Sequence, residues 1–410
     1  MELNKEWAYP LSNKFVLTRL KYCFKNSIAG EVIDKSWWNQ GEELLYTCQE
    51  TPIFSNFNKF PKRKRTKSGN LLLTRNATPY IFIPEENSIY SNVVQKIEVL
   101  PQNDLRFIKY SLECAVDSQR VNGDTIPSWN MDVWSNLYLP LFDKNKQIQI
   151  VDFLDDKCKR IDDIINTIND EIKCLNDYKY SYITEILTTN NDEKAVIVDN
   201  KIIKEIPSSW KVGRIKNVAK LLNGDRGSNY PSVNEIKQDG VPFITADDIH
   251  NYYIDSQLKK FITEQKYNKL GGVKLKTNDI IFCLRGSGAG NCSLNDKYNE
   301  GTVASSLVVI RPRHINVEFL NYLLQSNIVK FQNNLYYNGS CALNLSAENV
   351  SSYYIPIPDI NKQKEMVNFL NKKLKDIDEL MSLKQKKIDE LKKYKKSLIY
   401  EYVTGKKEVE

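Results

Sequence analysis

The feature that most constrains this chain is a long segment that occurs twice, 216 residues apart. LPLFDKNKQIQIVDFL occupies residues 139–154, and IPIPDINKQKEMVNFL occupies residues 355–370. The matches continue without a gap to Lys179, which recurs as Lys395. This period is far longer than the roughly 20–50 residues of solenoids and propellers. The chain is therefore a duplication of one domain-sized unit and not an array of short repeats.

The repeated segment predicts a long helix with a coiled-coil seam. Between Asn145 and Thr188 there is neither proline nor glycine, and apolar residues recur at alternating steps of three and four. The first seam consists of Val151, Leu154, Cys158, Ile161, Ile165, Ile168, Ile172 and Leu175. The second consists of Val367, Leu370, Leu374, Ile377, Met381, Lys384, Ile388 and Leu391. Each helix, of about 40 residues, would be about 60 Å long.

The simplest partner for either seam is the other, so we expect the two helices to pair as an antiparallel coiled coil. Lys384 interrupts the second seam once, a substitution that can fix the register of a coiled coil. The alternative is that each helix packs only on its own domain. Helices in globular domains usually run to about 8–20 residues, which favours pairing.

The segments that precede the helices predict two related domains, so the expected fold class is α+β with an internal pseudo-twofold duplication. GNLLLTRNATPY (69–80) resembles NDIIFCLRGSGAG (278–290), which aligns Arg75 with Arg285. Short β-type runs and one late helical patch in each segment indicate mixed α/β domains. The predicted boundaries are 1–138 for the first domain, 139–188 for the first helix, 189–204 for a linker, 205–354 for the second domain, 355–405 for the second helix and 406–410 for a tail.

Composition excludes several classes of protein. There is no run of about 18 apolar residues, so no membrane span is expected, and MELNKEWAYPLSNK lacks the apolar core of a secretory signal. Eight scattered cysteines without a CxxC pair, and only two histidines, argue against a zinc site or a disulfide framework and fit a reducing cytoplasm. We therefore expect no metal and no cofactor in this chain.

Several loops could contact nucleic acid. A net charge of +7 permits a polyanionic partner without requiring one. KFPKRKRTKSGN (59–70) concentrates cations that suit phosphate contacts, and arginine suits bidentate contact with guanine. RGSGAGN (285–291) lacks the Gly-Lys-Ser/Thr ending of a nucleotide-binding loop, so it is interpreted as a glycine-rich turn. The candidate DNA-binding residues are Lys62, Arg63, Lys64, Arg65, Lys67, Arg75, Arg226, Tyr230, Arg285 and Ser287; for each, a solvated surface residue without a ligand is the alternative.

Signals of catalysis are missing from the sequence. There is no Walker A motif, no GxSxG, no HExxH and no methyltransferase tetrad of the Asp-Pro-Pro-Tyr kind. Carboxylates are plentiful, but those of VDFLDDKCK (151–159) fall on the predicted coiled-coil helix. We therefore expect no catalytic residue and no enzymatic activity in this chain.

The chain resembles the specificity subunit of Type I restriction–modification systems. The resemblance rests on the duplicated P-x-x-D-x-N-K-Q segments, Pro140 to Gln147 and Pro356 to Gln363, and on the long helices that follow them. EIPSSWKVGRIKNVAKLLNG (205–224) is similar to the entry of that family's target-recognition domain. The first domain departs from the pattern, because it opens with KEWAYPLSNKF and has no clear counterpart of VPFITADDI (241–249).

The resemblance implies that each domain reads one half of a bipartite target in double-stranded DNA. It implies that the helix pair sets the unread spacer and docks two methyltransferase (modification) subunits, and that restriction–translocation subunits could join. S-adenosylmethionine would be bound by the modification subunits and not by this chain.

Two other functions are weighed against this one. An enzyme in its own right, a nuclease or methyltransferase, should carry a catalytic constellation. A coiled-coil scaffold that joins protein partners should show no sequence-dependent DNA binding and should not need two diverged domains.

Overall fold

The structure is a computed structural model that describes residues 7, 15–75, 78–119, 129–189, 194–225, 227–250, 253–254, 257–286, 288–336 and 344–409. The chain divides into two units, one formed by Met1–Asn169 with Gln385–Glu410 and the other by Asp170–Lys384. We call the globular part of each unit its domain. The boundaries between domains, helices and linker given above stay a prediction.

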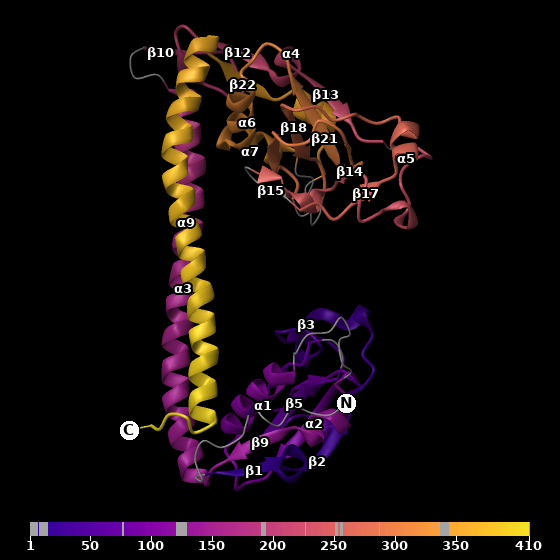
Figure 1. Cartoon of the computed structure of the whole chain (residues 1–410), viewed down its shortest axis with the longest axis vertical. Helices are drawn as coiled ribbons and strands as arrows, with labels where there is room; N and C mark the ends of the chain where they lie inside the picture. Colours follow the sequence, from indigo (N-terminus) through magenta and orange to yellow (C-terminus); the bar gives the residue numbers. More distant parts are fainter. Residues whose placement is uncertain are drawn as a thin grey trace. The chain divides into compact units, whose positions relative to one another are not determined.

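Two long helices pass through both units, as Figure 1 shows. They are α3, Lys144–Thr188, and α9, Ile360–Val403. Each begins at an N-cap carboxylate: Asp143 accepts a hydrogen bond from the Lys146 N–H, and Asp359 accepts one from the Lys362 N–H. The repeat itself opens with a short strand, because Tyr138–Leu141 forms β9 and Tyr354–Ile357 forms β22.

Within each unit the two helices run antiparallel and pack together, which confirms the predicted coiled coil. In the first unit Lys395 of α9 lies 2.6 Å from Asp162 of α3. In the second unit Lys179 of α3 lies 2.6 Å from Asp378 of α9. Because 395 − 179 and 378 − 162 both equal 216, the two ion pairs are related by the same pseudo-twofold symmetry as the sequence repeat. Lys384 reaches Glu171 at 2.7 Å instead of entering the seam.

Among the described residues, the first domain has a four-stranded, a three-stranded and a two-stranded sheet. Its strands are β1 Val16–Arg19, β2 Phe24–Ala29, β3 Trp38–Tyr46, β4 Ile53–Ser55, β5 Asn70–Thr74, β6 Ile81–Phe82, β7 Ile89–Tyr90, β8 Val94–Val99 and β9. The main sheet has the order β2-β8-β5-β6, the smaller one β4-β3-β7, and β1 pairs with β9. The helices are α1 Leu105–Gln119, α2 Met131–Asn136 and the 3-10 turns η2 Leu20–Tyr22, η3 Lys35–Trp37 and η4 Lys62–Lys64.

The second domain repeats this plan. Its strands are β12 Lys211–Arg214, β13 Ala219–Asn223, β14 Val241–Ile244, β15 Ile249–His250, β16 Tyr253–Ile254, β17 Phe261–Ile262, β18 Asp279–Cys283, β19 Cys292–Asn295, β20 Thr302–Val303, β21 Leu307–Pro312 and β22. The sheet orders are β13-β21-β18-β19 and β17-β14-β20, and β12 pairs with β22. Its helices are α4 Ile215–Val218, α5 Glu264–Lys269, α6 Val317–Gln325, α7 Asn327–Leu335 and α8 Ala347–Ser351, with η5 Val233–Glu235 and η6 Ala246–Asp248. Before it, β10 Ala195–Ile197 pairs with β11 Glu205–Pro207, so part of the predicted linker is a hairpin.

The two domains therefore have one topology, which confirms the predicted α+β duplication. In both, one parallel pair joins the smaller sheet: β3 with β7, and β14 with β20. This pairing makes Leu45 and Tyr46 the counterparts of Phe243 and Ile244. The first domain thus has a counterpart of VPFITADDI, at the end of β3, that the sequence comparison did not find.

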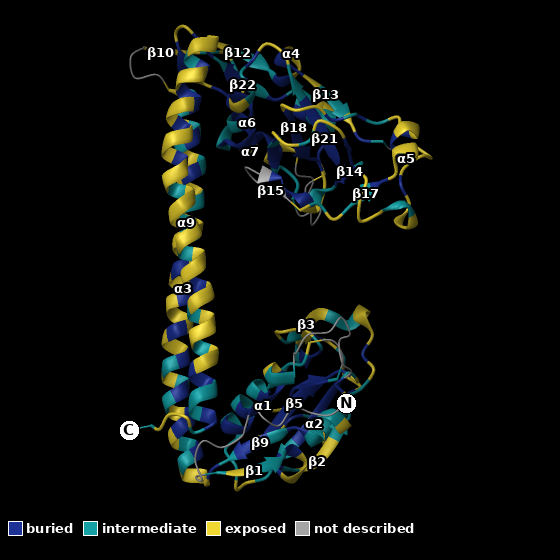
Figure 2. Cartoon of the chain, viewed as in Figure 1, coloured by how far each residue is buried: buried dark blue, intermediate teal, exposed yellow. Residues whose placement is uncertain are grey.

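Each core joins its domain to the paired helices. The second core includes Ile183 and Leu187 of α3, and Val367 and Leu370 of α9, with the sheet. In the first unit Tyr400 of α9 packs against the domain core. Figure 2 shows strands in the middle of the main sheets buried: β5 in the first domain, and β18 and β21 in the second.

A repeated glutamine fastens each domain to its helix and explains part of the repeat. The Oε1 of Gln147 accepts a hydrogen bond from the Asp104 N–H at 2.8 Å, and its Nε2 donates to the Phe142 carbonyl. Gln363 does the same with the Asn316 N–H and the Pro358 carbonyl. Both glutamines are buried, so leaving either partner unpaired would cost stability.

Candidate nucleic-acid interface

Each main sheet has two ends of different character. β13 and β18 both run antiparallel to β21, so they are parallel to each other and finish at the same end of the sheet. β2 and β5 finish together in the same way beside β8. We call this the loop end, and the opposite end, where β1 pairs with β9 or β12 with β22, the base.

A glycine at the loop end begins the loop in both domains. A side chain on Gly30 would meet the Tyr90 carbonyl oxygen at 2.2 Å, and one on Gly224 would meet the Val303 carbonyl oxygen at 2.4 Å. Only glycine allows the backbone to cross so closely. The loops that carry Tyr230, Arg75 and Arg285 leave from this end of the sheets.

The basic segment of the first domain divides into two groups. Lys64 is held by Glu31 at 2.6 Å, and Arg65 donates to the Glu43 carboxylate and to the Asn87 carbonyl. Within the described residues, Lys62, Arg63 and Lys67 have exposed side chains without an ion pair. The exposed group is available for phosphate, whereas the other two candidates stabilise the fold.

A buried lysine that the sequence analysis did not single out anchors this segment. Lys96 of β8 is 7 % exposed and donates to the carbonyls of Lys64 and Arg65 at 2.8 and 3.0 Å. Desolvation, followed by the charge of Lys67, lowers the pKa of Lys96. Nothing in the sequence distinguishes this buried lysine from an exposed one, because Lys96 does not interrupt the strand pattern of β8.

The alignment of Arg75 with Arg285 is wrong. The Arg75 N–H donates to the Val93 carbonyl, and the Leu284 N–H donates to the Ser306 carbonyl, at equivalent places beside β8 and β21. Leu284 is therefore the counterpart of Arg75, and Arg285 lies one residue further into its loop. Because leucine and isoleucine residues recur in both strands, the two segments can be aligned in more than one register, and the sequence alignment was displaced by one residue.

The other candidates of the second domain lie in two loops. Arg285 is exposed, and its backbone forms an isolated bridge with Asn344. Tyr230 is partly exposed, with its ring edge-on to Phe243 at 5.8 Å. Arg226 and Ser287 lie outside the described residues. The structure therefore keeps Arg285 and Tyr230 accessible to a ligand.

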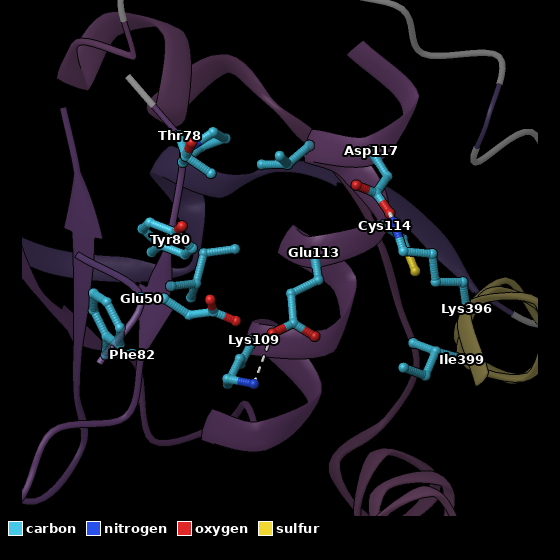
Figure 3. A pocket seen from close by; sticks show the side chains of 13 residues that line it. Glu50, Thr78, Tyr80, Phe82, Lys109, Glu113, Cys114, Asp117, Lys396 and Ile399 are labelled. Carbon is cyan, nitrogen blue, oxygen red and sulfur yellow. Dashed lines mark hydrogen bonds and ion pairs between the residues drawn. The ribbon is translucent and has the colours of Figure 1, made fainter. Parts of the chain in front are cut away.

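A pocket of about 480 Å³ lies in the first unit between α1, β6 and the end of α9 (Figure 3). Its charged groups are largely paired: Lys109 lies 2.7 Å from Glu113, and Lys396 lies 2.8 Å from Asp117. Burial raises the pKa of the Cys114 thiol well above its usual value. A protonated thiol is a poor nucleophile, so this cysteine lacks the activation of catalytic cysteines.

The described residues offer neither a metal site nor a membrane-spanning helix. There, no group of three or more His, Cys, Asp or Glu side chains could hold a metal ion. In the same part of the chain no helix is long and apolar enough to cross a membrane.

Comparison with known proteins identifies a family to which this chain is similar. The profile of the family described as "Type I restriction modification DNA specificity domain" matches residues 24–174 and 207–393. The chain is 26 % identical over 309 residues to the Type I restriction enzyme MjaVIII specificity subunit of Methanocaldococcus jannaschii, covering 73 % of this chain and 69 % of that protein.

Solved structures are similar to this chain, and the one with a TM-score above 0.5 shows the same fold. One, from work on complex assembly and conformational transition of the type I R-M system, is similar over 96 % of this chain and 99 % of its own, with a TM-score of 0.63 and 14 % identity. Another, the HsdS subunit from Thermoanaerobacter tengcongensis, covers 97 % and 98 % of the two chains at 14 % identity, with a TM-score of 0.40. The profile matches more than half of the chain, in two copies that follow the duplicated domains, and the chain therefore belongs to the Type I restriction–modification DNA specificity family.

Proposed function

We propose that this chain is the sequence-reading subunit of a Type I restriction–modification complex, with each domain reading one half of a bipartite DNA target. The observation that carries the proposal is the duplicated domain, which keeps one topology while its loops differ. Two different half-sites require two different protein surfaces. In both domains, contacts with the bases would supply the sequence specificity.

The paired helices would set the spacer between the half-sites and dock two methyltransferase subunits. Half-sites one turn apart lie about 34 Å from each other along DNA. Helices of the length of α3 and α9 could span that distance. In this proposal the chain performs no chemistry, S-adenosylmethionine is bound by the methyltransferase subunits, restriction–translocation subunits could join, and the complex acts on DNA in the cytoplasm.

The proposal can be tested by expressing the chain with its methyltransferase subunit in a host without DNA methylation and mapping modified bases across the genome. A split motif with a fixed gap would support sequence reading and would give both half-sites. A stable complex that adds no new motif would contradict the proposal and favour a protein scaffold.

A further inference from the structure

The chain segment at the base has the same length in both domains. TRLKYCFK (18–25) of the first domain matches GRIKNVAK (213–220) of the second without a gap. These segments contain the end of β1 or β12, the turn that follows, and the start of β2 or β13. Away from the base the length changes: the connection from β3 to β4 is 47–52, whereas that from β14 to β17 is 245–260.

Exposed charges recur at equivalent places on this base. Lys21 corresponds to Lys216 and Lys25 to Lys220, by their positions after the Arg19–Tyr138 and Arg214–Tyr354 strand pairs. Asp132 of α2 corresponds to Glu348 of α8, at the 216-residue offset of the repeat. All six side chains are exposed. We call these two sets of three residues the base faces.

The fold explains why both domains have an arginine at this place, but it does not explain why both have the two lysines. Arg19 donates to the Tyr138 hydroxyl at 3.1 Å, and Arg214 donates to the Tyr354 hydroxyl at 2.7 Å. Each guanidinium also lies over its tyrosine ring. In contrast, neither Lys216 nor Lys220 has an ion-pair partner among the described residues.

The second base face borders a groove of about 460 Å³. Lys216, Lys220 and Arg313 line it together with Glu348 and Ser351. Its wall also includes apolar atoms of Ala219, Leu221 and Ala347. A groove that combines apolar walls with charges of both signs is suited to a protein surface.

We propose that each base face completes, together with the paired helices, the docking site of one of two identical methyltransferase subunits, an inference that rests on the proposed function. Two copies of one partner require two equivalent surfaces, and the base is where the diverged domains keep the same length and the same set of two lysines and one carboxylate. The partner would present carboxylates to the lysine pair and a cation to Asp132 or Glu348.

The balance of charge at the first base favours this partner over the DNA backbone. Asp132, the counterpart of Glu348, lies on α2, which packs against η2, and Glu98 lies 3.8 Å from Lys25. Carboxylates at both bases would repel phosphate, whereas DNA-contacting surfaces are strongly positive. DNA binding by the base is therefore treated as an outcome of the test.

The test compares charge reversals in one copy at a time. Lys216→Glu with Lys220→Glu alters the second base face, and Lys21→Glu with Lys25→Glu alters the first. Each variant of the full chain is mixed with the methyltransferase subunit, and the stoichiometry is read by native mass spectrometry. We expect two bound subunits for the wild type, one for either double variant and none for the variant that combines all four changes.

Lys237→Glu with Lys259→Glu is the matched control, because it reverses two exposed charges outside the base faces and outside the candidate DNA-binding residues, and it should still bind two subunits. Thermal unfolding checks that each variant is folded; Lys→Ser pairs replace any reversal that is not. Two subunits bound to the fourfold variant would overturn the inference, as would retained stoichiometry with weaker DNA binding. A wild-type chain that binds no methyltransferase subunit would instead contradict the proposed function itself.

Discussion

Arg63 and Arg65 lie two residues apart in one basic segment, but their surroundings differ. Arg65 is mostly buried against Glu43 and the Asn87 carbonyl, whereas Arg63 is exposed. We expect Arg65→Ala to lower the free energy of unfolding by about 2 kcal/mol, because charged hydrogen bonds are lost. Arg63→Ala should change it by less than about 0.5 kcal/mol. Denaturant unfolding of both variants measures the difference, and equal effects would contradict this division of the segment.

Arg285 is the exposed arginine of a glycine-rich loop in the second domain. Arg285→Ala should weaken DNA binding by the assembled complex by about 1–3 kcal/mol if the side chain contacts a base. If it contacts a phosphate instead, the slope of log affinity against log salt should fall by about one. Lys211→Ala, an exposed cation at the base of the same domain, is the control. Affinity that is unchanged across a salt series would remove Arg285 from the interface.

At the scale of the helices, the two symmetry-related ion pairs differ in burial. The side chain of Lys179 is 1 % exposed, whereas that of Lys395 is 28 % exposed. We expect Asp378→Ala to cost about 3 kcal/mol, because it removes the carboxylate from a buried ammonium. Asp162→Ala should cost less than about 1 kcal/mol, as for exposed pairs. Chemical denaturation compares the two, and similar losses would show that burial does not set the strength of these pairs.

The same lysine makes stability depend on pH. Burial lowers the pKa of Lys179, although its hydrogen bond with Asp378 opposes the shift. Between this lowered pKa and the ordinary lysine value, the unfolded chain binds more protons than the folded chain, so stability rises with pH across that window. Lys179→Met should therefore reduce the rise in unfolding free energy as the pH increases toward the ordinary lysine pKa of about 10.4. An identical pH profile for variant and wild type would contradict this assignment.

The elements differ in how far the sequence predicts them. The helices and their seam were predictable, because a period of three and four residues is a local pattern. The counterpart of VPFITADDI was not, since β3 is defined by its parallel partner β7 and that pairing leaves no local signature. The role of Gln147 and Gln363 could not be predicted from the sequence either. The repeat shows that both copies have this glutamine, but only the fold brings the ends of α1 and α6 against it.

At the scale of the whole molecule, the sequence predicts the duplication but only part of the candidate interface. Six of the candidates, Lys62, Arg63, Lys67, Arg75, Tyr230 and Arg285, lie in loops or turns with at least partly accessible side chains. Lys64 and Arg65 instead serve the fold, which composition alone could not reveal, because a cation held by a carboxylate and a free one look alike in sequence.

The length of the helices is expected to set the length of the spacer. Inserting seven residues after Asn169 and seven after Lys384 would lengthen the helix pair by about 10 Å while preserving the seam. We expect the methylated motif to gain a longer gap, by up to about three base pairs at about 3.4 Å each. An insertion in one helix only should disrupt the pairing and abolish methylation. An unchanged gap after the double insertion would mean that the helices do not measure the spacer.

The paired lysines and aspartates have a consequence for how such a chain could arise. Each ion pair takes its cation from one copy of the repeat and its carboxylate from the other, as Lys179 with Asp378 and Lys395 with Asp162. A single copy thus carries both halves of the contact and is self-complementary. Two identical half-length chains could form the same two bonds in a homodimer, whose symmetry would match a palindrome. Fusion of the halves would then free each domain to diverge, turning a palindromic target into an asymmetric one.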